Sequence, residues 1–270
     1  MEYKKDANGN IIKVERKKGR TVKVVNPTKT VRKQPKNINV QPTVIEKKDA
    51  PHKIDPSTER RNPLLKYQKV GKIEPIFKDK VIYLIGGGPS LKNFDFKLLK
   101  NKVTIAINKA FMFLPDADVL YWTDFRFYKW YEKEINDFKG LKVTNKNKPI
   151  RDDVLNLKDT GRSGLDLDKS SLRHGNNSGF ATINLAVHLG AKKIVLLGYD
   201  MQSAAMSTHW HDGYKKINHN HKIYQKSMIP YFHTLVEPLK KLGVQVWNAN
   251  PKSNLDVFPK CNLIEAINMK

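Results

Sequence analysis

Short runs of apolar residues, each followed by glycine or polar residues, dominate the chain from about residue 80 onward. These runs lie at 81–85, 103–107, 117–122, 194–197 and 244–247. Continuous apolar runs of this length are typical of strands that are buried on both faces of a parallel sheet. The pattern therefore predicts five short buried strands.

Segments with helical spacing separate these runs. They cover 125–138, 178–189 and 224–242, and the last is interrupted by Pro230 and Pro238. The alternation predicts an α/β fold, a Rossmann-like parallel sheet flanked by helices, in which ligands bind beyond the carboxyl ends of the strands. The polar stretch 139–175 reads as an insertion or lid.

The first part of the chain has a different pattern, with apolar residues only in isolated pairs. Residues 1–60 hold 16 lysines and arginines against 7 acidic residues. Such a segment buries too little apolar surface to offset the entropy of ordering. We therefore expect a disordered basic arm over residues 1–75, ahead of the Rossmann-like domain over residues 76–270. Short Val/Thr alternations in the arm could still pair as strands.

The charge of the whole chain favours anionic partners. The formal net charge is +24 over 270 residues, which draws a protein toward nucleic acid through a salt-sensitive attraction, although a lysine-rich surface also serves solubility alone. Cys261 is the only cysteine, so no intramolecular disulfide can form. No apolar run approaches the roughly 20 residues of a spanning helix. We expect a cytoplasmic protein without a membrane span, and an arm that could bind nucleic acid.

The first candidate site is the loop after the first predicted strand, formed by Gly86, Gly87, Gly88, Pro89 and Ser90. Glycines allow a backbone to approach a phosphate closely, and proline suits the first turn of a following helix. The loop lacks the Gly-Lys-Ser/Thr ending of a Walker motif and the third glycine of the dinucleotide fingerprint. A plain tight turn remains an alternative interpretation.

Polar residues follow three of the predicted strands. Asn108, Thr123 with Asp124, and Asp200 each stand directly after an apolar run or just beyond it. Each could cap its own loop, but the repeated placement indicates a shared polar edge that could receive a ligand. Asp124 and Asp200 are also the candidate carboxylates for Mg²⁺.

Two further candidates lie later in the chain. Ser178, followed by Gly179, reads as the N-cap of an apolar helix whose first amides could hold an anion. A histidine-rich segment includes His209 and His211, which could supply a general base or, with Asp212, bind a metal; solvated loop histidines are the third alternative.

The order of these motifs resembles a known family. It comprises the strand and Gly-x-Gly-Pro-Ser-Leu turn at 81–91, Ile-Ala-Ile-Asn at 105–108, Ser-Gly at 178–179, the run 189–200 ending in Gly-Tyr-Asp, and 250–259. The set is similar to the DUF115 group, which includes archaeal hydroxymethylpterin pyrophosphokinases and many bacteriophage members. It more distantly resembles the bacterial sialyltransferases of glycosyltransferase family 42. The resemblance covers about residues 81–267.

The sialyltransferase resemblance implies a donor-binding site and a base. By matching motif, the residues at the nucleotide-sugar donor would be Gly86, Gly88, Ser90, Asn108, Ser178 and Gly179. His209 or His211 would deprotonate the acceptor hydroxyl. Gly87 stands where the sialyltransferases have asparagine. This departure argues against CMP-sialic acid as the donor.

The resemblance and the basic arm together leave three functions open. The first is transfer from a nucleotide-activated donor, with the nucleotide or nucleotide sugar as substrate and no covalently bound cofactor. The second is a Mg²⁺-dependent, pyrophosphokinase-like transfer from a nucleoside triphosphate, with Asp124 and Asp200 holding the metal. The third is a non-catalytic phage protein that binds nucleic acid or assists assembly. The sequence does not specify the oligomeric state.

Overall fold

We describe a computed structural model of the chain, which covers residues 2–5, 11–14, 71–145, 150–202 and 221–270. The chain divides into two units, Met1–Thr58 and Glu59–Lys270. In the first unit, β1 (Glu2–Lys5) and β2 (Ile11–Val14) pair as an antiparallel hairpin. The rest of the expected arm up to residue 70 lies outside the described residues.

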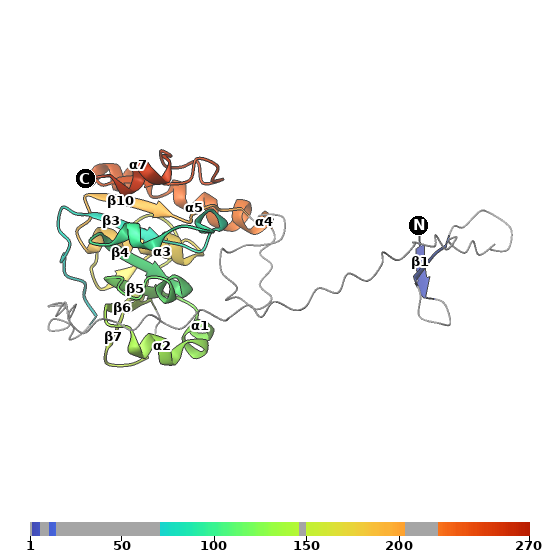
Figure 1. Ribbon diagram of the computed structural model, residues 1–270, viewed down its shortest axis with the longest axis horizontal. Helices are drawn as coiled ribbons and strands as arrows, with labels where there is room; N and C mark the ends of the chain where they lie inside the picture. The colour runs from blue at the N-terminus through green and yellow to red at the C-terminus, as the bar shows by residue number, and fades with distance from the viewer. Residues whose placement is uncertain (1, 6–10, 15–70, 146–149, 203–220) are drawn as a thin grey trace, which may run out of the picture. The chain divides into compact units, whose positions relative to one another are not determined.

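The second unit contains a seven-stranded parallel sheet, which confirms the predicted α/β class. In spatial order the strands are β11 (Gln245–Asn248), β10 (Lys193–Leu197), β3 (Val81–Ile85), β4 (Val103–Ile107), β5 (Val119–Trp122), β6 (Leu141–Thr144) and β7 (Val154–Asn156). Figure 1 shows β10, β3, β4, β5, β6 and β7 following one another from top to bottom.

The strand order reverses between β3 and β10. From β3 the chain builds outward through β4, β5, β6 and β7, and α3 (Ser178–His188) then returns it to β10 on the other side of β3. In sheets of this kind, the crevice at the reversal is the usual place for a ligand. The loops after β3 and β10 border this crevice.

Helices and short helical turns cover the two faces. The face of α3 also carries α5 (Ile229–His233) and α6 (Val236–Lys241), while the other carries η3 (Pro89–Leu91), η4 (Phe96–Leu99), η5 (Asn108–Met112), α1 (Phe125–Trp130), α2 (Glu132–Asp137) and α7 (Leu263–Ile267). The remaining elements are the short pair β8 (Lys158–Asp159) and β9 (Ser171–Leu172), α4 (His221–Ile223) and the π-helical turn η6 (Tyr224–Met228).

Alternation within the strands fills both layers of the core. Leu84 and Ile105 pack on the side of α3, whereas Tyr83 and Ala106, their neighbours in sequence, pack on the other side. All four are at most 1% exposed. Strands buried on both faces need apolar residues at every position, which is why these strands were visible as continuous runs.

The expectation of five strands was wrong, because the stretch 139–175 contributes two more strands to the sheet rather than an insertion or lid. The sequence of β6 is Leu-Lys-Val-Thr, which does not form an apolar run. Its lysine, Lys142, is nevertheless buried, and its Nζ lies 3.0 Å from Oδ2 of Asp153. A buried lysine is tolerated when a carboxylate pairs with it, and sequence patterns do not reveal that pairing.

The predicted helices at 125–138 and 224–242 are each divided. The first breaks at Tyr131, where φ is −125° and ψ is 26°, into α1 and α2. The second consists of η6, α5 and α6, with α5 containing Pro230 in its first turn. Proline lacks the amide hydrogen that a continuous helix would require at that position.

Candidate functional site

The loops after β3 and β10 lie against each other at the reversal of the sheet. The amide of Gly86 donates to the carbonyl of Leu197, and that of Gly88 donates to the carbonyl of Gly198, both at 2.8 Å. A Cβ on Gly86 would lie 2.7 Å from the Gly198 oxygen, and one on Gly88 would lie 2.0 Å from Oδ2 of Asp200. These two glycines are therefore required by the contact between the loops.

Asp200 and Ser90 join the two loops by side-chain contacts. Oδ1 of Asp200 accepts from the Ser90 amide at 3.0 Å, and Oδ2 accepts from Ser90 Oγ at 2.7 Å. Asp200 is 3% exposed. Burial raises the pKa of Asp200 above its ordinary value, and the hydrogen bonds from Ser90 act in the opposite direction. The carboxylate keeps further lone pairs for a ligand.

The glycine loop uses most of its amides internally. Gly86, Gly88 and Ser90 donate to acceptors in β10 and the loop that follows it, and Pro89 has no amide hydrogen. Gly87 is half-buried, and its N–H has no hydrogen-bond partner among the described residues. The loop as it stands offers a ligand one backbone donor rather than a cradle of several.

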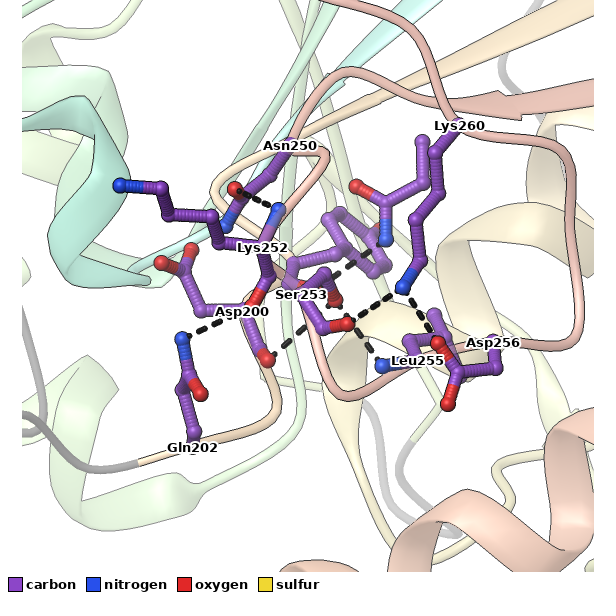
Figure 2. Close-up of polar contacts among 10 residues, drawn as sticks. Asp200, Gln202, Asn250, Lys252, Ser253, Leu255, Asp256 and Lys260 are labelled. Carbon is purple, nitrogen blue, oxygen red and sulfur yellow. Dashed lines mark hydrogen bonds and ion pairs between the residues drawn. The ribbon is translucent and has the colours of Figure 1, made fainter.

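The loop after β11 supports Asp200 from the other side. Ser253 Oγ donates to the carbonyl of Tyr199 at 2.6 Å, and the amide of Asn254 donates to the carbonyl of Asp200 at 2.9 Å. Gln202 Nε2 donates to the carbonyl of Lys252 at 3.1 Å. Figure 2 shows the contact between Gln202 and Lys252, and there the side chains of Lys252 and Asp200 extend to the same side of the loops. Lys252 thus brings a positive charge to the region.

Lys260 fixes this loop at its far end. Its Nζ donates to the carbonyl of Ser253 at 2.7 Å and pairs with the carboxylate of Asp256 (Figure 2). The amide of Leu255 donates to Ser253 Oγ at 3.0 Å. Because Ser253 is only 3% exposed, these bonds hold the loop in one position against Asp200.

The start of α3 meets the end of β5 at the same edge of the sheet. Ser178 Oγ donates to Thr123 Oγ1 at 3.3 Å, and Thr123 Oγ1 donates to the Tyr121 hydroxyl at 3.2 Å. A Cβ on Gly179 would lie 2.8 Å from Cε1 of Tyr199, so the helix start fits closely under that ring. The structure thus brings Ser178 and Gly179 to the edge that holds the polar strand ends.

The prediction that Ser178 caps α3 was wrong. Asn177 is the N-cap, because its Oδ1 accepts from the Phe180 amide at 2.8 Å. Ser178 is instead the first residue of the helix, which leaves its hydroxyl directed at Thr123. Asparagine and serine are both strong N-caps, so their order in the sequence did not decide between them.

Three residues at this edge of the sheet have left-handed backbones without being glycine. Their φ angles are 50° at Asn108, 60° at Asn176 and 48° at Met201. The conformation is unusual for methionine, and such strain concentrates at functional loops. The half-buried amide of Asn108 has no hydrogen-bond partner among the described residues and is free to meet a ligand.

Asp124, another sequence candidate, is engaged by the start of its own helix. Asp124 caps α1 through the Arg126 amide at 2.8 Å and pairs with the Arg126 guanidinium at 2.7 Å. His209 and His211 lie outside the described residues. Within the described ranges, no three histidine, cysteine, aspartate or glutamate side chains gather as a metal site.

Three residues near the site escaped the sequence analysis. Tyr224, in the π-helical turn, is 8% exposed, and its pKa is raised by burial and by the charge of Asp200. Lys252 gave no signal beyond the general abundance of lysine. Asn145 directly follows β6, a strand that went unrecognised; had it been found, the rule of polar strand ends would have selected it.

Comparisons with known proteins identify no relative of this chain. No protein-family model matches the chain, and neither curated proteins nor solved structures give a significant match. In the part of the chain that the structure describes, no helix is long and apolar enough to cross a membrane.

Proposed function

We propose that this protein transfers a group from a nucleotide-activated donor, with glycosyl transfer as the leading reaction. The observation that carries the proposal is the pairing of Ser90 with the buried Asp200 at the reversal of the parallel sheet. Asn108, Thr123 and Ser178 stand at the same edge, which supplies polar groups over several neighbouring strands. The resemblance to the sialyltransferases and the DUF115 group supports the same reaction class.

The site residues have distinct roles in this proposal. Asp200 accepts a hydrogen bond from a hydroxyl of the nucleotide ribose through its remaining lone pairs, and the Gly87 amide and Asn108 contact the donor. The amino end of α3, whose dipole favours negative charge, and the Lys252 side chain stabilise the leaving phosphate. Positive charge near the phosphate is needed because Asp200 itself is acidic.

The transfer step requires a base. The acceptor hydroxyl attacks the anomeric carbon of the donor, the bond from that carbon to the phosphate oxygen breaks, and the nucleotide leaves with the bonding electrons. The hydroxyl proton passes to His209 or His211. Both histidines follow Asp200 within 11 residues of sequence, so the chain can bring them to the site.

A Mg²⁺-dependent transfer from a nucleoside triphosphate is the second candidate. It is favoured by one feature, the buried Asp200 carboxylate at the place where a triphosphate would bind. Asp124, the other carboxylate of this proposal, would have to release Arg126 in order to bind the metal.

The test is calorimetric binding of CMP, UDP, UDP-glucose and ATP, each with and without Mg²⁺. The variant Asn108→Gly removes the amide while keeping a residue that tolerates φ of 50°. We expect it to weaken nucleotide binding by about tenfold, the size of one lost hydrogen bond. Asn101→Gly is the control, since Asn101 also has a left-handed φ, of 66°, but precedes β4 at the opposite edge.

The outcomes separate the candidates. Binding of CMP, UDP or UDP-glucose that depends on Asn108 supports the glycosyl-transfer proposal. Binding of ATP alone, and only with Mg²⁺, favours the pyrophosphokinase-like candidate. If no nucleotide binds, or if Asn108→Gly and Asn101→Gly behave alike, we abandon the site as a nucleotide site.

A further inference from the structure

Asn145 is a buried amide that lacks hydrogen bonds at both ends of its side chain. It directly follows β6 and is 2% exposed, yet neither Nδ2 nor Oδ1 has a partner among the described residues. Trp122, Asn136, Arg173 and Asn248 each have a single unpaired buried atom, but Asn145 has two. Buried polar groups are nearly always hydrogen-bonded, so an unpaired one destabilises the fold unless something else binds to it.

The parallel register places Asn145 beside Thr123. Trp122 of β5 pairs with Thr144 of β6, so the next residues on the two strands, Thr123 and Asn145, are neighbours. Adjacent strands lie about 4.8 Å apart. The unpaired amide of Asn145 therefore lies next to the hydroxyl groups of Thr123 and Ser178, whose oxygen atoms are 3.3 Å apart.

The alternation of β6 directs Asn145 to the face of α3. Leu141 and Val143 pack in the same core cluster as Phe180 of α3, whereas Thr144 bonds to the carbonyl of Trp122. A side chain two residues beyond Val143 continues on the face of Val143. The amide thus points to the side of the sheet on which α3 begins.

The polar side chains that hydrogen bonds link next to Asn145 are neutral donors and acceptors, and the charge of Asp159 also acts on one of them, Tyr121. They are the hydroxyls of Thr123, Ser178 and Tyr121, beside the Asn145 amide itself. Burial, with the charge of Asp159 in addition, raises the pKa of Tyr121, so its hydroxyl stays protonated. Sugar hydroxyls, which both donate and accept, fit such a set, whereas phosphate is best bound by charged donors.

We propose that Asn145 and Thr123 form a subsite for the hydroxyls of a carbohydrate acceptor, with Ser178 at its border with the donor. This inference rests on the proposed function, because it names where the second substrate binds. Three strand spacings, about 14 Å, separate β6 from β3. The donor thus has room between the Gly86–Ser90 loop and this subsite.

The test combines stability with ligand binding in the full chain. Asn145→Leu has nearly the same shape and removes the unpaired amide, so we expect a higher thermal midpoint. Saturation-transfer NMR with the methyl glycosides of glucose, galactose and N-acetylglucosamine should show contact of at least one with the native protein. We expect that signal to fall at least fivefold in Asn145→Leu.

The control is Asn136→Leu. Asn136 has an unpaired buried oxygen too, but it lies in α2, which leads into the amino end of β6. Glycoside signals should persist in this variant. Nucleotide affinity should stay within twofold of the native value in both variants, because neither residue belongs to the donor site.

Three results would overturn the subsite. They are a native protein that binds none of the glycosides, an Asn145→Leu variant that keeps the glycoside signal, and a midpoint that falls in Asn145→Leu, which would reveal a structural partner of the amide. If glycoside binding depends on Asn145 while no nucleotide binds, the subsite stands and the proposed transfer does not.

Discussion

Asp200 accepts two hydrogen bonds from Ser90, one from the amide at 3.0 Å and one from Oγ at 2.7 Å, although 110 positions separate the two residues. The contact joins the loops that follow β3 and β10 at the carboxyl ends of the two strands. A buried carboxylate is costly unless it is bonded, so Ser90 both joins the loops and makes the acid tolerable. The predictions below begin from this pair.

Replacing Gly88 should damage the contact between the loops. Gly88 has φ of −65°, which alanine adopts freely, so any loss comes from the new Cβ, which would meet Asp200 Oδ2 at 2.0 Å. We expect Gly88→Ala to lower the free energy of unfolding by about 1–3 kcal/mol, as overpacking does. Urea denaturation measures it, and calorimetry should show weaker nucleotide binding.

Gly243→Ala is the control for this variant. Gly243 has φ of 67° and nothing within 4 Å of its added Cβ, so alanine there meets backbone strain without a clash. It should cost stability but leave nucleotide binding intact. Equal loss of binding in both variants would show that the Gly88 effect is not local.

The raised pKa of Asp200 predicts a pH dependence of stability. Because the folded pKa lies above the unfolded value of about 3.9, the folded state holds the proton more tightly. The stability contributed by this group is full below that value and is lost as pH rises through the folded pKa. The unfolding free energy of the native protein should therefore fall relative to Asp200→Asn as pH rises from about 4.

Asp168 provides a comparison of opposite sign. Two hydrogen bonds from Ser170 lower the pKa of Asp168. The bond from the Ser170 amide has the larger effect, and the bond from its hydroxyl adds to it. Its contribution is present above the unfolded value and is lost as pH falls. The unfolding free energy of the native protein should therefore rise relative to Asp168→Asn as pH rises, whereas it falls relative to Asp200→Asn. If the two differences change with pH in the same direction, the assignment for Asp200 is contradicted.

His188 should make the stability of the protein sensitive to acid in a higher pH range than the aspartates do. It is 4% exposed, its Nε2 lies 2.9 Å from the Ser171 carbonyl oxygen, and burial lowers its pKa. Its contribution is therefore present above the unfolded value of about 6.5 and is lost as pH falls below it. Denaturation between pH 7 and 5 should show less pH dependence in His188→Gln. His233→Gln replaces an exposed histidine and serves as the matched control.

The basic arm should bind DNA without sequence preference. Residues 1–60 carry 16 lysines and arginines against 7 acidic residues. Removing them should shift elution from a DNA column to markedly lower salt, because each phosphate contact adds to the salt dependence. Elution at unchanged salt would assign DNA retention to the rest of the chain. If the column retains neither the full chain nor the shortened one, the nucleic-acid hypothesis is wrong.

The sequence located the elements that carry the candidate site better than it located the contacts among them. The apolar runs located β3, β4, β5, β10 and β11, and the rule of polar strand ends selected Asn108 and Asp200. It missed Asn145, because β6 contains Lys142, whose pairing with Asp153 is invisible in one sequence. The roles of His209 and His211 stay predictions, since both lie outside the described residues.

The amino-acid sequence alone determined the class of fold, because local patterns of apolar residues and glycines indicate buried strands and turns. Only the tertiary structure decided that Gly88 is glycine because Asp200 lies against it, that Ser90 bonds to that acid, and that Asn145 lies unpaired beside Thr123. The reason is physical: local pattern fixes what each segment can become, whereas these contacts join segments far apart in sequence and exist only once the strands have taken their order in the sheet.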